Sequence, residues 1–266
     1  MSHEAPLVRL EGVGFRYPGA AREALSGLDL DLPPGRITAV LGPNGSGKTT
    51  LLHLLLGLHD PTAGEARLLG RPWAEVSRRE RARLLCLVPQ EEPISFPLSV
   101  AEYALLGRAP HLGLLAQPGP EDRAAAAQAL DDTGIAHLAD RSMMELSGGE
   151  RQLCAVARAL AQRTPLVLMD EPTSHLDLGN TRRVLDLMAR VRASGRAVVF
   201  TTHDPNAALA VAEKAMLLKE GRMIACGHAR DVLNAETLGE TFGVDVALLD
   251  HGQQRVVVVR GRGEGA

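Results

Sequence analysis

The stretch that decides the fold is Gly42-Pro43-Asn44-Gly45-Ser46-Gly47-Lys48-Thr49. It fits the pattern G-x-x-x-x-G-K-[ST], follows a short apolar run at residues 37–41 and precedes a run of helical composition at residues 49–56. In such a strand, loop and helix unit, glycines let backbone N–H groups curl around phosphate oxygens, and the helix N-terminus adds partial positive charge. Lys48 then reaches the outer phosphates, while the Thr49 hydroxyl ligates Mg²⁺. The stretch and the residue that follows it predict a nucleoside-triphosphate site with contacts from Gly42, Asn44, Gly45, Gly47, Lys48, Thr49 and Thr50.

The placement of lysine supports this interpretation over a chance glycine turn. The chain has only three lysines, Lys48, Lys214 and Lys219, so the only lysine of the first 213 residues falls inside the loop.

The composition is that of a soluble globular chain. Of the 266 residues, 45% are apolar and 23% are charged, which excludes a disordered or collagen-like chain. The net charge is −3, whereas binding along a nucleic-acid duplex normally needs a basic excess, so we expect no nucleic-acid partner. Cys86, Cys154 and Cys226 lie far apart and form no CxxC pair, which indicates neither a disulfide framework nor a zinc site.

The pattern of apolar residues predicts an α/β fold. Residues 7–32 alternate apolar with polar or small side chains around a Pro18-Gly19 break, as antiparallel strands do. From residue 37 onward, short apolar strands alternate with helices, which implies a parallel sheet covered on both faces. The expected helices include residues 147–162, 178–194 and 205–215, and the expected hairpins lie within residues 216–224 and 246–259.

The predicted fold is therefore a P-loop NTPase core with a parallel sheet, an N-terminal antiparallel β subdomain and a helical insertion. We divide the chain into four segments. They are residues 1–90 (antiparallel β subdomain and start of the core), 91–145 (helical subdomain), 146–227 (remainder of the core) and 228–266 (C-terminal helices, hairpin and tail). The arginine-rich run at residues 78–83 is interpreted as a solvated helix face.

Two adjacent carboxylates end the apolar run at residues 166–169. A buried strand ends in Asp170 and Glu171 only if these groups are solvated or meet positive charge, which Mg²⁺ and a triphosphate supply. In this interpretation Asp170 holds the metal and Glu171 polarises the attacking water. An ordinary helix cap would also explain an acid at a strand end.

A third motif precedes the helix expected from residue 147. In Leu146-Ser147-Gly148-Gly149-Glu150-Arg151-Gln152, Ser147 is a plausible N-cap, and the two glycines permit an anion to approach exposed N–H groups. A cap alone would explain the serine but not the whole motif. LSGGERQ, the phosphate loop and LVLMDEPTSHLD at residues 166–177 together resemble the ATP-binding subunit of ABC transporters, over nearly the whole chain.

The resemblance implies roles for residues that their local pattern does not assign. Tyr17 would stack on adenine, and Gln90 would link the metal and the attacking water to the transport partner. Asp177 matches the D-loop and His203 the switch histidine. Ser147, Gly148, Gly149 and Gln152 belong to the signature loop. The catalytic set is thus Glu171, His203 and Gln90, and the metal set is Thr49, Gln90 and Asp170. Outside the family context, Tyr17 would more simply be a packed hairpin residue.

The resemblance also implies partners and cofactors. In this family the signature loop of one subunit completes the phosphate site of another, so we expect a homodimer that binds ATP and Mg²⁺ at two sites. No run reaches about 18 apolar residues. We therefore expect a peripheral subunit at the cytoplasmic face of the inner membrane, joined to integral membrane permease subunits and indirectly served by a substrate-binding protein.

Further segments favour one subfamily of importers. Residues 95–100 (SFPLSV), 106–111 (LGRAPH) and 172–180 (PTSHLDLGN) resemble the ATPases that serve iron-chelate, haem and cobalamin import. Molybdate or tungstate importers have similar segments, so both cargo classes stay open. A soluble ABC-type ATPase of iron–sulfur cluster assembly is a further alternative. A nucleotide-binding regulator without turnover is disfavoured because Glu171 and His203 are both in place.

Overall fold

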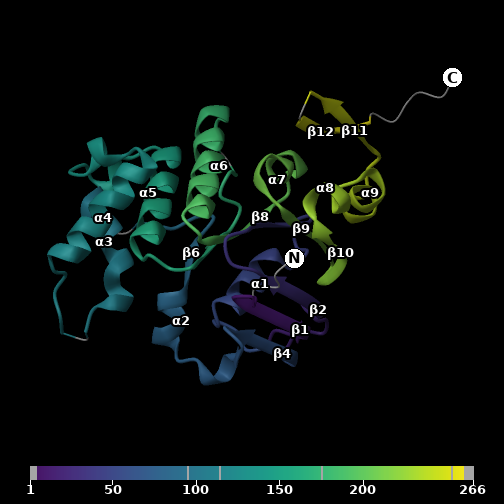
Figure 1. Ribbon diagram of the computed structural model, residues 1–266, viewed down its shortest axis with the longest axis horizontal. Coiled ribbons are helices and arrows are strands. Elements are labelled where there is room, and N and C mark those ends of the chain that lie inside the picture. Colours follow the sequence, from purple (N-terminus) through teal and green to yellow (C-terminus); the bar gives the residue numbers. More distant parts are fainter. Residues whose placement is uncertain (1–4, 95, 114, 175, 253, 261–266) are drawn as a thin grey trace.

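A six-stranded sheet forms the centre of the computed structural model (Figure 1), which describes residues 5–94, 96–113, 115–174, 176–252 and 254–260. Ser95 and His175, which belong to two of the motifs above, lie outside the described residues. The strands, in the order of the sheet, are β10 (Arg222–His228), β9 (Lys214–Lys219), β3 (Ile37–Leu41), β8 (Ala197–Thr202), β7 (Leu166–Met169) and β6 (Leu85–Val88). The five strands from β9 to β6 run parallel, and β10 pairs antiparallel with β9.

The central strands are apolar on both sides because both faces of the sheet are covered. In β3, Ile37, Ala39 and Leu41 join one buried cluster, whereas Val40 joins the other. The same alternation occurs in β7 and β8. Since parallel strands end at one edge, the loops that follow β3, β7 and β8 lie side by side there.

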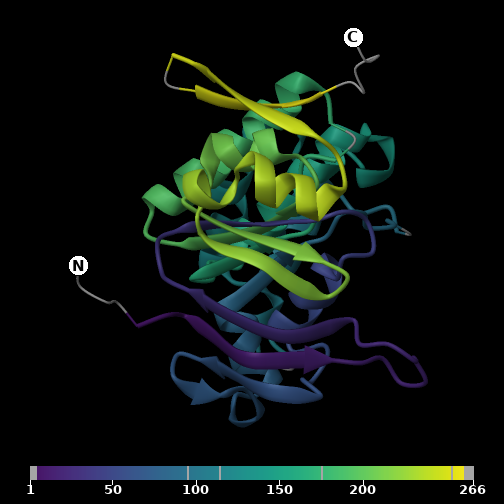
Figure 2. The same cartoon turned by 90° about the vertical axis from the view of Figure 1, so that its right-hand side faces the viewer.

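One face of the central sheet packs against α1 (Lys48–Leu55) and a second, antiparallel sheet. Its strands, in order, are β2 (Leu25–Leu32), β1 (Val8–Phe15), β4 (Ala63–Leu68) and β5 (Arg71–Pro72). Figure 2 shows this sheet beneath β9 and β10. The apolar side chains of α1, including Leu51 and Leu55, belong to the same buried cluster as β1, β2 and β4. The phosphate-loop helix is thus held between the two sheets.

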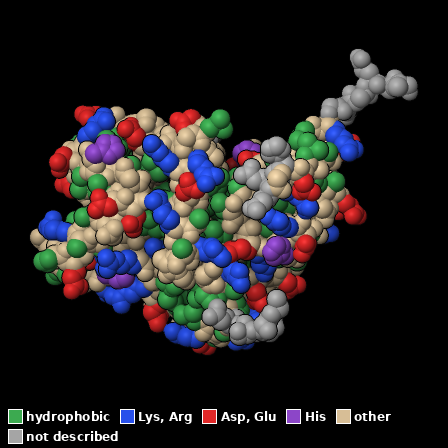
Figure 3. Space-filling view, turned by 45° about the horizontal axis from the view of Figure 1, so that its top comes forward, with side chains coloured by type: hydrophobic (Ala, Val, Ile, Leu, Met, Phe, Trp, Pro, Cys, Tyr) green, Lys and Arg blue, Asp and Glu red, His purple; other side chains and the backbone are tan. Residues whose placement is uncertain are grey.

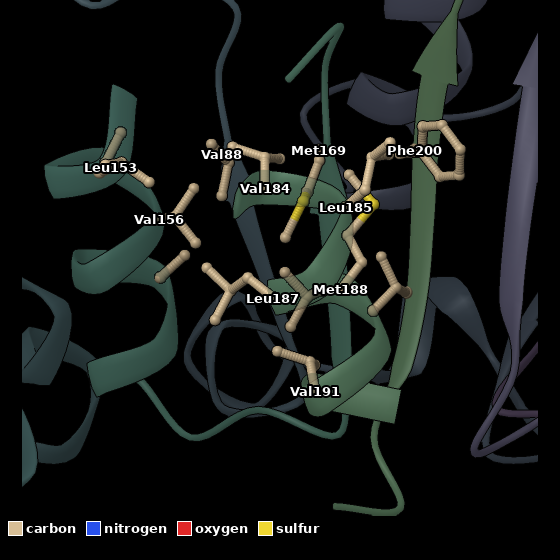
Figure 4. Close-up of a cluster of buried hydrophobic side chains, with 14 of the residues drawn as sticks. Val88, Leu153, Val156, Met169, Val184, Leu185, Leu187, Met188, Val191 and Phe200 are labelled. Atoms are coloured by element: carbon tan, nitrogen blue, oxygen red, sulfur yellow. The ribbon is translucent and has the colours of Figure 1, made fainter. Parts of the chain in front are cut away.

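The other face carries helices from the middle of the chain. These are α3 (Val100–Leu105), α4 (Pro120–Thr133), α5 (Gly148–Ala161) and α6 (Leu178–Ala193), with short 3₁₀ helices at Leu106–His111, Ala136–Leu138 and Met143–Glu145. Figure 4 shows α6 placing Leu185, Met188 and Val191 against β7, β8 and α5. With the antiparallel sheet on the opposite face, this arrangement confirms the predicted fold class.

A short helix joins the antiparallel sheet to the centre. Helix α2 (Arg78–Leu84) follows a 3₁₀ helix at Trp73–Glu75, and none of its residues is buried, as the arginine-rich run predicts. Its arginines are nevertheless not all simply solvated. Arg79 donates a hydrogen bond to the carbonyl of Leu112, and Arg83 donates one at 3.1 Å to that of Pro110. The run therefore ties the helical segment at residues 91–145, called the helical lobe below, to the antiparallel side of the molecule.

The C-terminal elements lie beyond β10. They are α8 (Ala229–Val232), α9 (Ala235–Phe242) and a two-stranded hairpin of β11 (Val246–His251) and β12 (Gln254–Val259). The helix expected at residues 205–215 is shorter: α7 is Pro205–Val211. The N–H of Glu213 donates to the carbonyl of Ile37, which draws the chain into β9 and ends the helix.

The outer surface is mixed in charge. Basic and acidic side chains are interspersed over the face shown in Figure 3, in agreement with the small net charge. Within the described residues, no helix is both long and apolar enough to cross a bilayer.

The packing of Phe200 gives the first testable expectation. This β8 side chain is fully buried beside α6 (Figure 4). Phe200→Ala should lower the free energy of unfolding by about 3 to 5 kcal/mol, because it removes apolar contact and leaves a cavity. Val259→Ala, on an exposed valine, should change it little. Urea unfolding followed by circular dichroism would measure both. Equal losses for the two variants would contradict the described core.

Candidate functional site

A cleft of about 1390 Å³ opens beside the phosphate loop, at the carboxyl edge of the central sheet. Nine of the predicted site residues line it: Tyr17, Asn44, Gly45, Gly47, Lys48, Thr49, Thr50, Gln90 and Glu171. The lining also includes the basic side chains of Arg16, Arg22, Lys219 and Arg222. The cleft therefore brings the glycine loop, a carboxylate and several cations together.

The loop needs glycine for two separate reasons. Gly47, which immediately precedes α1, has φ of 105°, a region that other residues rarely adopt. A Cβ on Gly42 would lie 2.2 Å from the carbonyl oxygen of Leu218, so the loop packs directly on the backbone of β9. The N–H of Gly221, in the turn after β9, also donates to the carbonyl of Ser46. The end of β9 and the β9–β10 turn thus pack against the phosphate loop and hold it in place.

Lys48 is held by oxygen atoms on all sides. Its Nζ donates to the carbonyls of Gly42 and Pro43 at 2.8 and 3.2 Å, and it lies 3.1 Å from Oε1 of Glu171. The side chain is only 6% exposed. A buried ammonium needs such partners, and phosphate oxygens are chemically equivalent replacements for the carboxylate.

Asp170 and Thr49 form an oxygen pair of the kind that Mg²⁺ prefers. The Thr49 hydroxyl donates to Oδ2 of Asp170 at 2.8 Å, and the Thr201 hydroxyl donates to Oδ1 at 2.6 Å. Because Mg²⁺ takes oxygen ligands, usually one or two carboxylates with phosphates and waters, this donor set fits that ion.

Glu171 is fixed in an unusual backbone conformation. Its φ is 42°, in the left-handed region, which costs a non-glycine residue about 1 to 2 kcal/mol. Its N–H donates to the Thr201 hydroxyl at 2.8 Å, which helps to hold this conformation. The carboxylate then lies between Lys48 and His203, whose Nδ1 is 2.7 Å from Oε2.

The charge of Glu171 follows from these neighbours. Burial by itself raises the pKa of this carboxyl, but hydrogen bonds and positive charge from His203 and Lys48 outweigh it and leave the pKa below its usual value. Glu171 is therefore ionised at neutral pH and can accept a hydrogen bond or a proton from water.

Tyr17 is both packed and exposed to the cleft. Its hydroxyl is 3.1 Å from Oγ1 of Thr50, and its ring makes edge contacts with Phe15 and His59, at centroid distances of 4.9 and 5.3 Å. The residue is 38% exposed. The geometry thus fits the simple packing role and leaves room for a base at the same residue.

The signature motif forms the N-terminus of α5. Ser147 and Glu150 make a reciprocal capping box, in which the Ser147 N–H donates to Oε2 of Glu150 at 2.8 Å. Hydrogen bonds from the backbone and side chain of Ser147 lower the pKa of Glu150. A Cβ on Gly149 would lie 2.7 Å from Nδ2 of Asn180, whose amide in turn donates to Asp177, the N-cap of α6. The signature loop and the D-loop are therefore in contact.

The signature residues do not share the cleft of the phosphate loop. Gly148 and Gln152 line a second cleft of about 720 Å³, together with Gln90, Met144 and Leu176. Gln90 lines both clefts. Asp177 and His203 are absent from the described linings of the two clefts, although His203 contacts Glu171 directly. One chain thus presents two separated half-sites, with Gln90 between them.

Two residues that the sequence reasoning missed complete the geometry. Thr201 joins Asp170 to Glu171, and its signal was a threonine pair at the end of an apolar strand just before His203. Glu92, two residues beyond Gln90, accepts a hydrogen bond from the Tyr103 hydroxyl and pairs with Arg158 of α5 at 2.7 Å. Nothing in the local pattern around Glu92 indicates this link, because its partners are distant in sequence.

Comparison with known proteins gives the class of this chain. Residues 25–174 match the ABC transporter family. The hemin import ATP-binding protein HmuV of Myxococcus xanthus is 42% identical over 248 residues, which cover 91% of this chain and 92% of that protein. The chain therefore belongs to the ABC transporter family and is its ATP-binding ATPase component, which confirms the resemblance drawn from the motifs.

Other similar proteins include a second import protein and two solved structures. The molybdate import ATP-binding protein MolC of Haemophilus influenzae is 41% identical over 234 residues, which cover 88% of this chain and 87% of that protein. A solved metal-chelate type ABC transporter in an inward-facing conformation has a TM-score of 0.84 at 36% identity, covering 96% of this chain and 98% of that one. A dimeric ATP-binding cassette with ADP and phosphate has a TM-score of 0.75 at 29% identity, covering 84% and 99%.

Thr201 offers a test of the geometry that is independent of any ligand. Thr201→Val removes the hydrogen bonds to Asp170 and Glu171 while keeping the shape of the side chain. It should lower the free energy of unfolding by about 1 to 3 kcal/mol, because buried polar atoms lose their partner. Thr201→Ser keeps the hydroxyl and should retain more of the stability. If thermal unfolding gave the valine variant the higher midpoint, the described network would be wrong.

Proposed function

We propose that this chain is the ATP-hydrolysing subunit of an importer that takes up a metal chelate, with haem as the first candidate. The observation that carries the catalytic part is the contact of Glu171 with both Lys48 and His203 at the mouth of the phosphate loop. Similarity to the hemin import proteins and to the metal-chelate transporter supports the cargo class.

The proposed chemistry uses the groups of one cleft. Lys48 and the loop N–H groups bind the outer phosphates of ATP, and Tyr17 stacks on the base. Ionised Glu171 polarises the attacking water through a hydrogen bond and takes its proton. The water oxygen forms the new bond to the terminal phosphorus as the bond from that phosphorus to the bridging oxygen breaks, and ADP leaves with the bridging oxygen. Glu171 holds His203 through Nδ1, so the other ring nitrogen, Nε2, is available to contact the terminal phosphate.

Thr49 and Asp170 would hold Mg²⁺, with Gln90 as a further ligand at the edge of the cleft. The hydroxyl and carboxylate oxygens of Thr49 and Asp170 lie 2.8 Å apart, so the donor set is suited to this ion. When bound, Mg²⁺ would neutralise charge that develops on the phosphates.

The proposed active unit is a homodimer. Ser147, Gly148 and Gly149 lie at the exposed start of a helix and away from the phosphate loop's cleft, so a second copy can present them to the nucleotide. Two complementary half-sites on each chain give two equivalent composite sites under two-fold symmetry. The dimeric cassette found among the similar structures supports this arrangement.

The proposed membrane partner is a pair of integral permease subunits. The second cleft lies beside Gln90 and between the core and the helical lobe, and its lining Met144 is 58% exposed. Phe96 and Leu106, in the same lobe, are also exposed. This surface would place the chain peripherally at the cytoplasmic face of the membrane, with a substrate-binding protein reaching it only through the permease.

A molybdate importer is the second candidate function. The similarity to MolC is nearly as high as that to HmuV, and both cover most of this chain. Cargo does not enter either cleft of this subunit in the proposed scheme, so the site described above does not distinguish the two.

Two variants test the catalytic assignment. Glu171→Gln should bind ATP but hydrolyse it at least about 100-fold more slowly, because the base is lost, and should migrate as a dimer with ATP on size exclusion. Lys48→Ala should lose ATP affinity. Glu236→Gln and Lys214→Ala, which change the same residue types away from the cleft, are the matched controls. Normal turnover by Glu171→Gln would remove this residue from its role.

Reconstitution tests the cargo. The chain should co-purify with a permease from membranes, and in proteoliposomes its ATPase activity should rise when the cognate binding protein is loaded with haem. Molybdate is the comparison ligand. Stimulation by molybdate alone would establish the second candidate, and stimulation by neither would overturn both.

A further inference from the structure

The amide of Asn206 pairs with the main chain of Val257 as a neighbouring strand would. Its Oδ1 accepts from the Val257 N–H at 2.8 Å, and its Nδ2 donates to the Val257 carbonyl at 3.2 Å. An edge strand presents such N–H and C=O groups without partners, and an asparagine side chain carries one matching acceptor and donor. Asn206, 51 residues away in sequence, thus attaches β12 to α7.

The same residue lies three positions after His203. The Asp204 N–H donates to the Thr202 hydroxyl at 3.0 Å, and the Asn206 N–H donates to Oδ1 of Asp204 at 2.8 Å. The loop that carries His203 is therefore fixed to β8 at one end and, through Asn206, to the C-terminal hairpin at the other. A continuous set of hydrogen bonds runs from Val257 to this loop.

The hairpin depends on attachments of this kind. Among the described strands, β11 and β12 pair only with each other, and an isolated two-stranded hairpin is marginal in water. One face packs inward through Val246 and Val257, whereas Leu249, Val256 and Val258 remain exposed on the other. Besides that packing, the hydrogen bonds that join the described residues of the hairpin to α7 are the two of Asn206.

We propose that Asn206 is a positioning residue for His203, through which the C-terminal hairpin sets the activity of the ATPase site. The inference rests on the role proposed for His203. His203 is 58% exposed and has one described side-chain partner, Glu171, so its backbone loop determines where the ring lies. Loss of the hairpin contact loosens that loop without altering the phosphate loop, Tyr17 or Asp170.

The central experiment is a double-mutant cycle on the full-length chain. Asn206→Ala removes both bonds, and Val257→Pro removes the N–H that Asn206 accepts without removing a donor that β11 uses. We expect each variant to lower kcat about tenfold with KM for ATP within about twofold, because small misplacement of a catalytic group affects the chemical step. Val257→Ala, which loses the buried side chain but keeps the N–H, is the reference for Val257→Pro. Relative to that reference both variants cut one link, so the double variant should be no slower than the slower single variant.

A spectroscopic readout separates positioning from mere stability. The imidazole ¹⁵N and ¹H resonances of His203, assigned through loss in His203→Ala, should shift in Asn206→Ala. Asn206→Asp keeps only the acceptor and should fall between wild type and Asn206→Ala in kcat. Val258→Thr changes the exposed neighbour of Val257 and is the matched control, for which kcat and the His203 resonances should not change.

Two results would overturn the proposal. One is a wild-type kcat and unshifted His203 resonances in Asn206→Ala, even if its melting temperature falls. The other is a multiplicative loss of kcat in the double variant, which would mean independent effects. Failure of the proposed function is distinct, since it would be seen as absence of ATP hydrolysis by the wild-type chain, while the His203 resonance shift could still be measured.

Discussion

The site depends on the ion pair between the Lys48 ammonium and the Glu171 carboxylate. Both side chains are less than a tenth exposed, and each is further satisfied by carbonyl or imidazole groups. Burial of either charge without the other would be costly. The pair exists because β3 and β7 are both parallel strands of one sheet and end at the same edge, with β8 between them. Sheet topology therefore produces the arrangement of charges. ATP phosphates can replace Glu171 as the anionic partner of Lys48, and Glu171 keeps its contact with His203, so no buried charge is left unpaired.

The same topology keeps the other half of the proposed site apart. Ser147 caps helix α5 in a reciprocal capping box with Glu150, and the first turn of the helix lines a different cleft. In the proposed scheme, the binding site around a nucleotide held by the phosphate loop is thus incomplete within one chain. Gln90 lines both clefts, whereas Glu92 lines only the second and is joined to α5 through Arg158.

Most of the fold could be predicted from local pattern, because buried parallel strands and capped helices have strong signals. The phosphate loop, the carboxylates after β7 and the Ser147 cap were recognisable from short motifs whose chemistry is local. The end of α7 was not, since a long-range bond from Glu213 to Ile37 decides it. The contacts of Thr201, Glu92 and Asn206 were equally hidden, because each joins residues 11 to 66 positions apart in the chain and leaves no periodic trace. Pattern thus located the candidate site residues, and tertiary structure was needed to find what holds them.

The structure of Glu171→Gln in complex with Mg²⁺ and ATP would test the composite nucleotide site directly. We expect two copies per complex, with each terminal phosphate between Lys48 of one copy and Ser147 and Gly149 of the other, and with Lys48 moved from residue 171 to phosphate oxygen. An ATP fully enclosed by one copy, with Ser147 of every copy facing solvent, would contradict this expectation.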